Sequence, residues 1–154
     1  MLFRSVKILN ENIKLLAEMD KSIKINFYTQ NENILFECDK EQIGRVFFNL
    51  IKNSIESIQQ KSEKNLNFEK KILIEITQNN DHIKIVIIDN GVGLNNLKDN
   101  IKNILNPYYT TKKNGTGLGL SIVNKIINDH DGELDFFSLS DGAKVEIKFR
   151  VNGN

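Results

Sequence analysis

The sequence predicts an α+β fold, a two-layer sandwich in which one mixed β-sheet carries helices on one face. Three observations predict it. Apolar residues recur at three- and four-residue steps over 6–17 and 43–58, which is the spacing of amphipathic helices. Short apolar runs bounded by polar turns, typical of strands, occupy much of the remaining chain. The length of 154 residues suits one ordinary domain, because a chain near this length buries roughly 70% of its surface. We therefore expect residues 1–154 to form a single domain.

The first elements are expected to be a helix and a hairpin. The apolar positions of 6–17 fall on one stripe, which indicates a helix that packs against a core. Two strand-like runs follow at 23–28 and 34–38, and the polar segment 30–33 between them reads as a turn. These two runs are therefore predicted to pair as a hairpin.

A long helix should come next. Asp39 is a suitable N-cap residue, and Gln42 stands three residues later as in a capping box. The helical apolar pattern then continues over 43–58. The charged and polar stretch 59–71 is expected to be a solvent-facing loop without a motif.

The second half is expected to complete the sheet. The predicted elements are strands over 72–78 and 83–88, short helices over 97–105 and 121–128, and a final strand pair over 134–138 and 143–151. The run 83–88 is almost continuously apolar, and such strands are buried on both faces. This strand should therefore lie in the middle of the sheet.

Composition excludes several classes of partner. Lysine and arginine number 21 against 20 acidic residues, so the net charge of +1 predicts neither nucleic-acid binding nor direct contact with an anionic membrane. No apolar stretch approaches the roughly 20 residues needed to span a bilayer. The only cysteine, Cys38, lies in an apolar run and is expected to be a buried thiol in a cytoplasmic protein.

The long helix carries polar residues on one face. Asn49 and Asn53 are four residues apart, and Arg45 and Glu56 extend the same stripe. An ordinary amphipathic helix would explain this pattern. However, asparagine is a mediocre helix former, and its amide oxygen can ligate Mg²⁺.

Two glycine-containing segments are candidate nucleotide sites. Asp89, Gly91 and Gly93 follow the predicted central strand, where they could form a simple turn. Alternatively, they form a site in which the Asp89 carboxylate accepts a hydrogen bond from adenine and the glycines leave room for the purine ring. The segment 115–120 runs into a helix, so its backbone N–H groups can bind phosphate. A flexible loop with a helix cap is the simpler alternative. The glycine spacing fits neither a P-loop nor a dinucleotide fingerprint.

Taken in order, these segments resemble the nucleotide-binding domains shared by DNA gyrase, mismatch-repair proteins, heat-shock ATPases and histidine kinases. Residues 49–53 are similar to the N box, 89–93 to the G1 box, 107–112 to the F box and 115–120 to the G2 box. The resemblance covers nearly the whole chain. It implies the Bergerat type of α/β sandwich, with ATP and Mg²⁺ as cofactors.

The resemblance also implies roles for individual residues. Asn53 corresponds to the Mg²⁺ ligand, and Asn49 and Lys112 to catalytic residues. The residues that correspond to the nucleotide-binding positions are Asn49, Asn53, Asp89, Gly91, Gly93, Tyr109, Thr110, Thr111, Lys112, Gly115, Thr116, Gly117, Leu118, Gly119 and Leu120. The segment 107–117 is expected to be a mobile lid in which Lys112 and Lys113 reach the terminal phosphates.

One position separates kinases from hydrolases. The hydrolysing members have a glutamate that activates water where this sequence has Asn49, and an amide cannot act as that base. The chain is therefore expected to be the catalytic domain of a sensor histidine kinase, with motifs that resemble the nitrogen-regulation type. The alternatives are an ATP-hydrolysing conformational switch of the gyrase or chaperone type, and a nucleotide-sensing module with an inactive site.

The phosphoacceptor motif of histidine kinases has no counterpart here. The two histidines, His82 and His130, are expected to be structural or solvent-exposed; His130 belongs to a segment that resembles the family's His-Gly-Gly turn. The expected partners are the dimerisation and phosphoacceptor helix of a longer parent kinase and the receiver domain of a response regulator. The isolated chain should be monomeric and unable to phosphorylate itself, and the parent can be anchored in a membrane.

Overall fold

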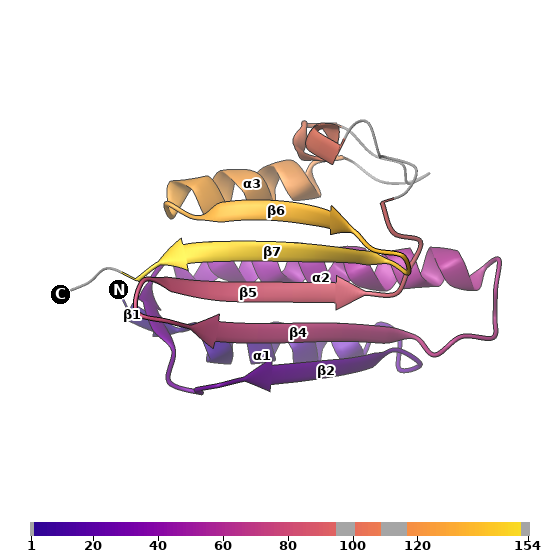
Figure 1. The fold of residues 1–154 in the computed structure, drawn as a ribbon, viewed down its shortest axis with the longest axis horizontal. Helices are drawn as coiled ribbons and strands as arrows, with labels where there is room; N and C mark the ends of the chain where they lie inside the picture. Colours follow the sequence, from indigo (N-terminus) through magenta and orange to yellow (C-terminus); the bar gives the residue numbers. More distant parts are fainter. Residues whose placement is uncertain (1, 95–100, 109–116, 152–154) are drawn as a thin grey trace.

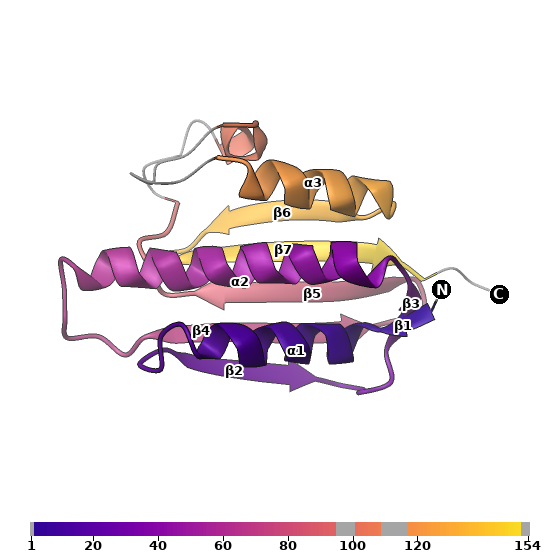
Figure 2. The same cartoon turned by 180° about the vertical axis from the view of Figure 1, so that it is seen from behind.

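The structure, a computed structural model, describes residues 2–94, 101–108 and 117–151 (Figure 1). A five-stranded sheet has the order β2-β4-β5-β7-β6, and a two-stranded sheet pairs β1 with β3. Within the described residues the chain forms three α-helices, and they lie on one face of the large sheet (Figure 2). The elements in chain order are β1 (Leu2–Arg4), α1 (Ser5–Ala17), β2 (Lys24–Thr29), β3 (Leu35–Glu37), α2 (Lys40–Ser62), β4 (Lys71–Gln78), β5 (His82–Asp89), η2 (Ile101–Leu105), α3 (Gly119–Asp129), β6 (Glu133–Ser138) and β7 (Ala143–Arg150). The predicted α+β sandwich is confirmed.

The large sheet is mixed, as predicted. β2 runs parallel to β4, whereas the pairs β4–β5, β5–β7 and β6–β7 are antiparallel. β5 is the third of the five strands. Its residues Ile83, Ile85 and Ile87 are buried, which explains why its sequence is so apolar. The prediction of a central strand is confirmed.

The predicted hairpin between 23–28 and 34–38 is wrong. β2 pairs with β4, with Phe27 opposite Ile74, and β3 pairs with β1. β3 holds only three residues, and its Phe36 is buried with its ring stacked on Phe149, at 4.8 Å between centroids. Packing of this ring on β7 places β3 at the end of the large sheet, away from the outer edge where β2 lies.

The long helix begins as predicted and ends later. Asp39 Oδ1 accepts a hydrogen bond from the backbone N–H of Gln42 at 3.0 Å, so the predicted N-cap is confirmed. The helix continues to Ser62, into the segment expected to be a loop. Of the helix predicted over 97–105, the structure describes only the short 3-10 helix η2.

The three helices and the sheet enclose one hydrophobic core, which includes the predicted buried thiol of Cys38. The described termini lie at one end of the molecule (Figure 1). The last residue of β5, the β6–β7 turn and the start of α3 gather near the opposite end. Within the described ranges, no helix is long and apolar enough to cross a membrane.

Candidate functional site

A carboxylate is buried at the end of the central strand. Asp89 closes β5 and exposes only 6% of its surface. Its Oδ2 accepts a hydrogen bond from Ser54 Oγ at 3.1 Å, and its Oδ1 accepts one from the Gly91 N–H at 2.9 Å. Burial raises the pKa of this carboxyl, while these hydrogen bonds and the positive charge of Lys61 oppose the rise. Because a buried carboxylate lowers stability, its presence at the end of a strand indicates a functional role.

The glycines after Asp89 are required by close backbone contacts. A Cβ atom on Gly91 would lie 2.2 Å from Ser57 Oγ and 2.6 Å from the Ser57 carbonyl carbon in α2. Gly93 has a φ of +70°, and a Cβ there would approach the Gly142 carbonyl oxygen to 2.7 Å. Gly142, in the β6–β7 turn, packs on the carbonyl oxygen of Asp89. The structure thus gives Gly91 and Gly93 a packing role, whereas the sequence suggests room for a purine ring.

One face of α2 contacts the end of β5 and the loop that follows it. The residues that contact it are Ser54, Ser57 and Lys61, at positions i, i+3 and i+7, which we call the loop-facing stripe. Ser54 binds Asp89, Ser57 accepts from the Val92 N–H through its carbonyl oxygen at 3.3 Å and its Oγ at 3.1 Å, and Lys61 Nζ donates to the Asn90 carbonyl oxygen at 2.8 Å. Apart from its helical spacing, which is the signal that could have indicated it, nothing in the sequence pointed to this stripe, and its residues were not among the predicted site residues.

Asn90 was also not among the predicted site residues. Its Oδ1 accepts from the backbone N–H of Lys71 at 2.9 Å, and its Nδ2 donates to the Glu69 carbonyl oxygen at 2.6 Å. The side chain therefore ties the loop after β5 to the chain that enters β4.

The asparagine face of α2 meets the start of α3. Asn49 Nδ2 donates to the Arg45 carbonyl oxygen at 2.8 Å. Its Oδ1 is directed at α3, because a Cβ on Gly119 would lie 3.0 Å from it. Asn53 and Glu56 are half-buried further along the same helix. The structure thus brings Asn49 close to the glycine-rich segment, although 69 residues lie between them in sequence.

The described part of the glycine-rich segment opens α3. Gly117 has a φ of +71°, a conformation that favours glycine, and Leu118 precedes the helix. Ser121 Oγ donates to the Leu118 carbonyl oxygen at 2.9 Å. Leu120 is half-buried in the first turn. The remaining predicted site residues lie outside the described ranges: Tyr109, Thr110, Thr111, Lys112, Lys113, Gly115 and Thr116.

The two histidines lie at the ends of secondary-structure elements, His82 at the start of β5 and His130 directly after α3. His130 Nε2 accepts from the Asp39 N–H at 3.1 Å, so Nδ1 carries the hydrogen and donates to the Ile126 carbonyl oxygen at 2.7 Å. His130 therefore joins the end of α3 to the N-cap of α2, which is the structural role predicted. His82 is half-exposed at the start of β5.

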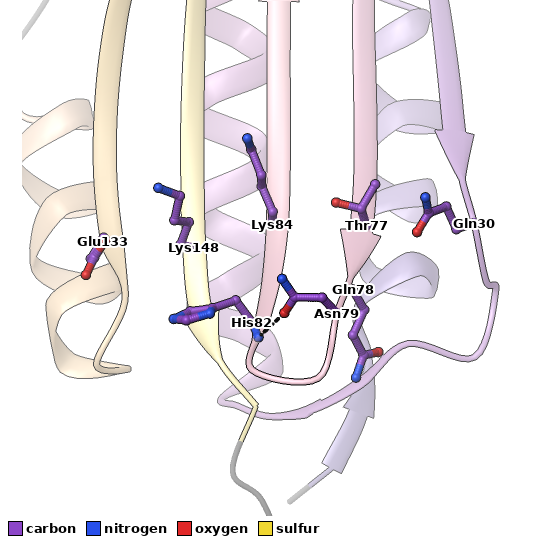
Figure 3. A pocket seen from close by; sticks show the side chains of 8 residues that line it. All are labelled: Gln30, Thr77, Gln78, Asn79, His82, Lys84, Glu133 and Lys148. Atoms are coloured by element: carbon purple, nitrogen blue, oxygen red, sulfur yellow. Dashed lines mark hydrogen bonds between the residues drawn. The ribbon is translucent and has the colours of Figure 1, made fainter.

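A shallow hollow of about 490 Å³ lies on the open face of the sheet (Figure 3). Its lining residues are Gln30, Thr77, Gln78, Asn79, His82, Lys84, Glu133 and Lys148. Lys84 and Lys148 both contact the carboxylate of Glu146, at 3.1 and 3.3 Å. The hollow is at the opposite end of β5 from Asp89 and belongs to a different region from the site described above.

Comparison with known proteins gives consistent matches. Residues 38–153 match the family described as histidine kinase-, DNA gyrase B-, and HSP90-like ATPase. An NtrY-like sensor histidine kinase of Rickettsia conorii is 35% identical over 145 residues, which cover 94% of this chain and 22% of that protein. The chain thus spans less than a quarter of the length of this relative.

Solved structures of a histidine kinase have a similar fold. The nucleotide-free catalytic domain of histidine kinase ThkA superposes with a TM-score of 0.82 at 28% identity, covering 97% of this chain and 94% of that chain. A structure of ThkA in complex with the response regulator protein TrrA superposes with a TM-score of 0.76 at 25% identity, covering 97% of this chain and 41% of that chain.

The fold, the buried carboxylate and the glycine-rich start of α3 define a nucleotide-binding domain, and the chain belongs to the family of histidine kinase-, DNA gyrase B- and HSP90-like ATPases. Within this family it is an ATP-binding catalytic domain of the two-component sensor histidine kinase type. The predicted likeness to nitrogen-regulation kinases is confirmed by the NtrY-like relatives.

Proposed function

We propose that the domain binds ATP with Mg²⁺ between α2, the loop after β5 and the start of α3, and passes the γ-phosphate to a histidine on the dimerisation helix of a longer parent kinase. The convergence of Asp89 and Gly119 on α2 carries this proposal. Asp89 contacts Ser54 and Gly119 lies against Asn49, so the two contacts are five residues apart on α2. At 1.5 Å per residue this is roughly 7.5 Å along the helix, so one nucleotide can reach both.

Each part of the site has a proposed role. Asp89 accepts a hydrogen bond from the exocyclic amine of adenine, and the backbone N–H groups of 118–120 bind phosphate oxygens. Asn53 offers an amide oxygen to Mg²⁺, which prefers one or two protein ligands beside phosphate and water and neutralises phosphate charge when bound. Asn49 stands where hydrolysing relatives have a glutamate and supplies no base for water. The roles of residues 109–116 stay predictions from the sequence.

The first prediction is that the isolated chain binds ATP with Mg²⁺ at a single site and hydrolyses it negligibly. The reason is that position 49 holds an asparagine, which cannot activate water as a glutamate would. Isothermal titration gives the stoichiometry, and phosphate release gives the turnover. Transfer of labelled phosphate from ATP to a separately purified acceptor domain of the parent kinase tests the kinase function directly. Steady phosphate release would favour the hydrolysing switch, and absence of binding would favour an inactive nucleotide-sensing site.

The second prediction separates Mg²⁺ binding from recognition of adenine. Asn53→Ala is expected to reduce the Mg²⁺-dependent gain in ATP affinity by about tenfold, or ~1.4 kcal/mol, because it removes the proposed metal ligand. Affinity for ATP without Mg²⁺ should change much less. Asn12→Ala is the matched control, since Asn12 is also a half-buried asparagine within a helix but lies on α1. An unchanged metal dependence in Asn53→Ala would move the ligand elsewhere, with Asn49 the next candidate.

The partners follow from the same proposal. We infer that the parent kinase phosphorylates a response regulator, in line with the complex of ThkA with TrrA. The domain would act in the cytoplasm, where ATP is present, whether or not the parent protein is anchored in a membrane.

A further inference from the structure

Lys61 lies at the end of the loop-facing stripe and joins three separate segments. Its ammonium donates to the carbonyl oxygen of Asn90, the residue directly after Asp89, at 2.8 Å. It also contacts Asp141 in the β6–β7 turn at 2.5 Å, and it lies 4.6 Å from the centroid of the Phe68 ring. Only 22% of the lysine side chain is exposed. The ammonium is therefore held by contacts on several sides.

The bond to Asn90 distinguishes Lys61 from an ordinary surface lysine. The side chain of Asp141 is 65% exposed, and ion pairs with such groups contribute little to stability. The Asn90 carbonyl, by contrast, belongs to the backbone that orients the Asp89 carboxylate. Without the ammonium, this carbonyl would lose a charge-assisted hydrogen bond, which is among the stronger kinds.

Lys61 also affects Asp89 through its charge. The ammonium is close enough to favour the ionised carboxylate, against the effect of burial. An ionised carboxylate accepts hydrogen bonds only, whereas a protonated one presents a donor on one oxygen. Lys61 thus supports both the position and the acceptor character of Asp89.

We propose that Lys61 is a positioning residue of the nucleotide site, which orients Asp89 through the Asn90 carbonyl and so sets the preference for purines that carry a 6-amino group. This inference rests on the proposed function, because it requires that Asp89 reads the adenine amine. Lys61 itself touches no nucleotide in this scheme. Its effect should therefore appear in base recognition and leave phosphate binding largely unchanged.

The test compares ADP with the diphosphate of unsubstituted purine riboside, which lacks the 6-amino group. Lys61→Met removes the ammonium and keeps an unbranched side chain that is one atom shorter. We expect it to weaken ADP binding by about tenfold and the analogue by less than twofold, so the ratio of the two affinities falls. Lys64→Met is the matched control, because Lys64 is exposed one turn further along the chain; it should change neither affinity.

The outcomes are distinct. Equal losses for ADP and the analogue in Lys61→Met would mean a general structural role and would overturn the inference, as would unchanged binding of both. In either case, the proposed function would stand if the parent chain binds ADP more tightly than the analogue. Failure of the parent chain to distinguish ADP from the analogue would overturn the role of Asp89 as well. Asp141→Asn should reduce the ratio less than Lys61→Met, because it leaves the bond to Asn90 in place.

Discussion

Asp89→Asn is expected to weaken ADP binding by about 100-fold, equivalent to ~2.8 kcal/mol. The carboxylate already accepts from the Gly91 N–H and from the Ser54 hydroxyl, and in the proposed site it also accepts from the adenine amine. An asparagine has one acceptor oxygen for these three donors, and its NH₂ group would face at least one of them. An unpaired donor in a buried site costs about 1–3 kcal/mol.

Glu146→Gln provides a matched control for this variant. Glu146 is also a carboxylate with 6% of its surface exposed, but it lies on β7 and contacts lysines on the open face of the sheet. Titration calorimetry should find ADP affinity unchanged in Glu146→Gln. If Asp89→Asn also binds ADP with unchanged affinity, the assignment of adenine recognition to Asp89 is wrong.

The variants Asp89→Asn and Glu146→Gln should also change the stability of the domain in opposite directions. Burial raises the pKa of Asp89 above the ordinary 3.8, so its ionisation lowers stability as the pH rises through the folded-state pKa. Asp89→Asn removes this loss and should gain stability relative to the parent between mildly acidic and neutral pH, with the gain vanishing in acid. Thermal melts of both proteins across this range check the sign.

Glu146 behaves in the reverse way. Burial alone would raise its pKa, but hydrogen bonds and charge from Lys84 and Lys148 outweigh burial, and the pKa of this carboxyl lies below its ordinary 4.5. Lysine side chains, rather than the core, cover much of this group. Glu146→Gln should therefore lower stability at neutral pH, and the difference should fade as the pH falls through the folded-state pKa. We expect Glu146→Gln to be less stable and to bind ADP normally, whereas Asp89→Asn should be more stable and bind ADP weakly. This result would separate effects on folding from effects on adenine recognition.

Gly91→Ala is expected to lower the free energy of unfolding by about 3 kcal/mol and to abolish nucleotide binding. The added methyl would lie 2.6 Å from the Ser57 carbonyl carbon and 2.8 Å from the Ile58 nitrogen, both in the backbone of α2. This part of α2 cannot easily move away, because Ile58 is fully buried in the core. The loop must shift instead, and that shift would break the hydrogen bond between the Gly91 N–H and Asp89.

Urea unfolding and ADP titration measure the two effects. Gly44→Ala is the control, because a Cβ at Gly44 meets its nearest atom at an ordinary 3.7 Å, and alanine should stabilise helix α2 by up to about 1 kcal/mol. If Gly91→Ala unfolds at the same urea concentration as the parent and still binds ADP, the close packing of this loop on α2 is not required.

Patterns within a few residues were sufficient for most of the elements. The helical spacing and the Asp39 N-cap predicted α2, and the continuous apolar run predicted the central place of β5, because these features depend on neighbours at most four or so positions away. The pairing of β2 and β3 could not be predicted in this way. Their alternating residues suit several partners, and the stacking of Phe36 on the distant Phe149 favours one arrangement.

The candidate site divides similarly. The sequence by itself predicted which residues would carry the chemistry, since Asp89, Asn49 and the glycines stand in recognisable motifs. Only the tertiary structure decided what holds them in place. Ser57 lies 35 residues from Val92, and Lys61 lies 29 residues from Asn90 and 80 from Asp141. The helical spacing of Ser57 and Lys61 indicates that they share a face of α2, but it does not identify what that face contacts. These contacts arise only when the packing of α2 on the sheet brings distant segments within hydrogen-bonding distance.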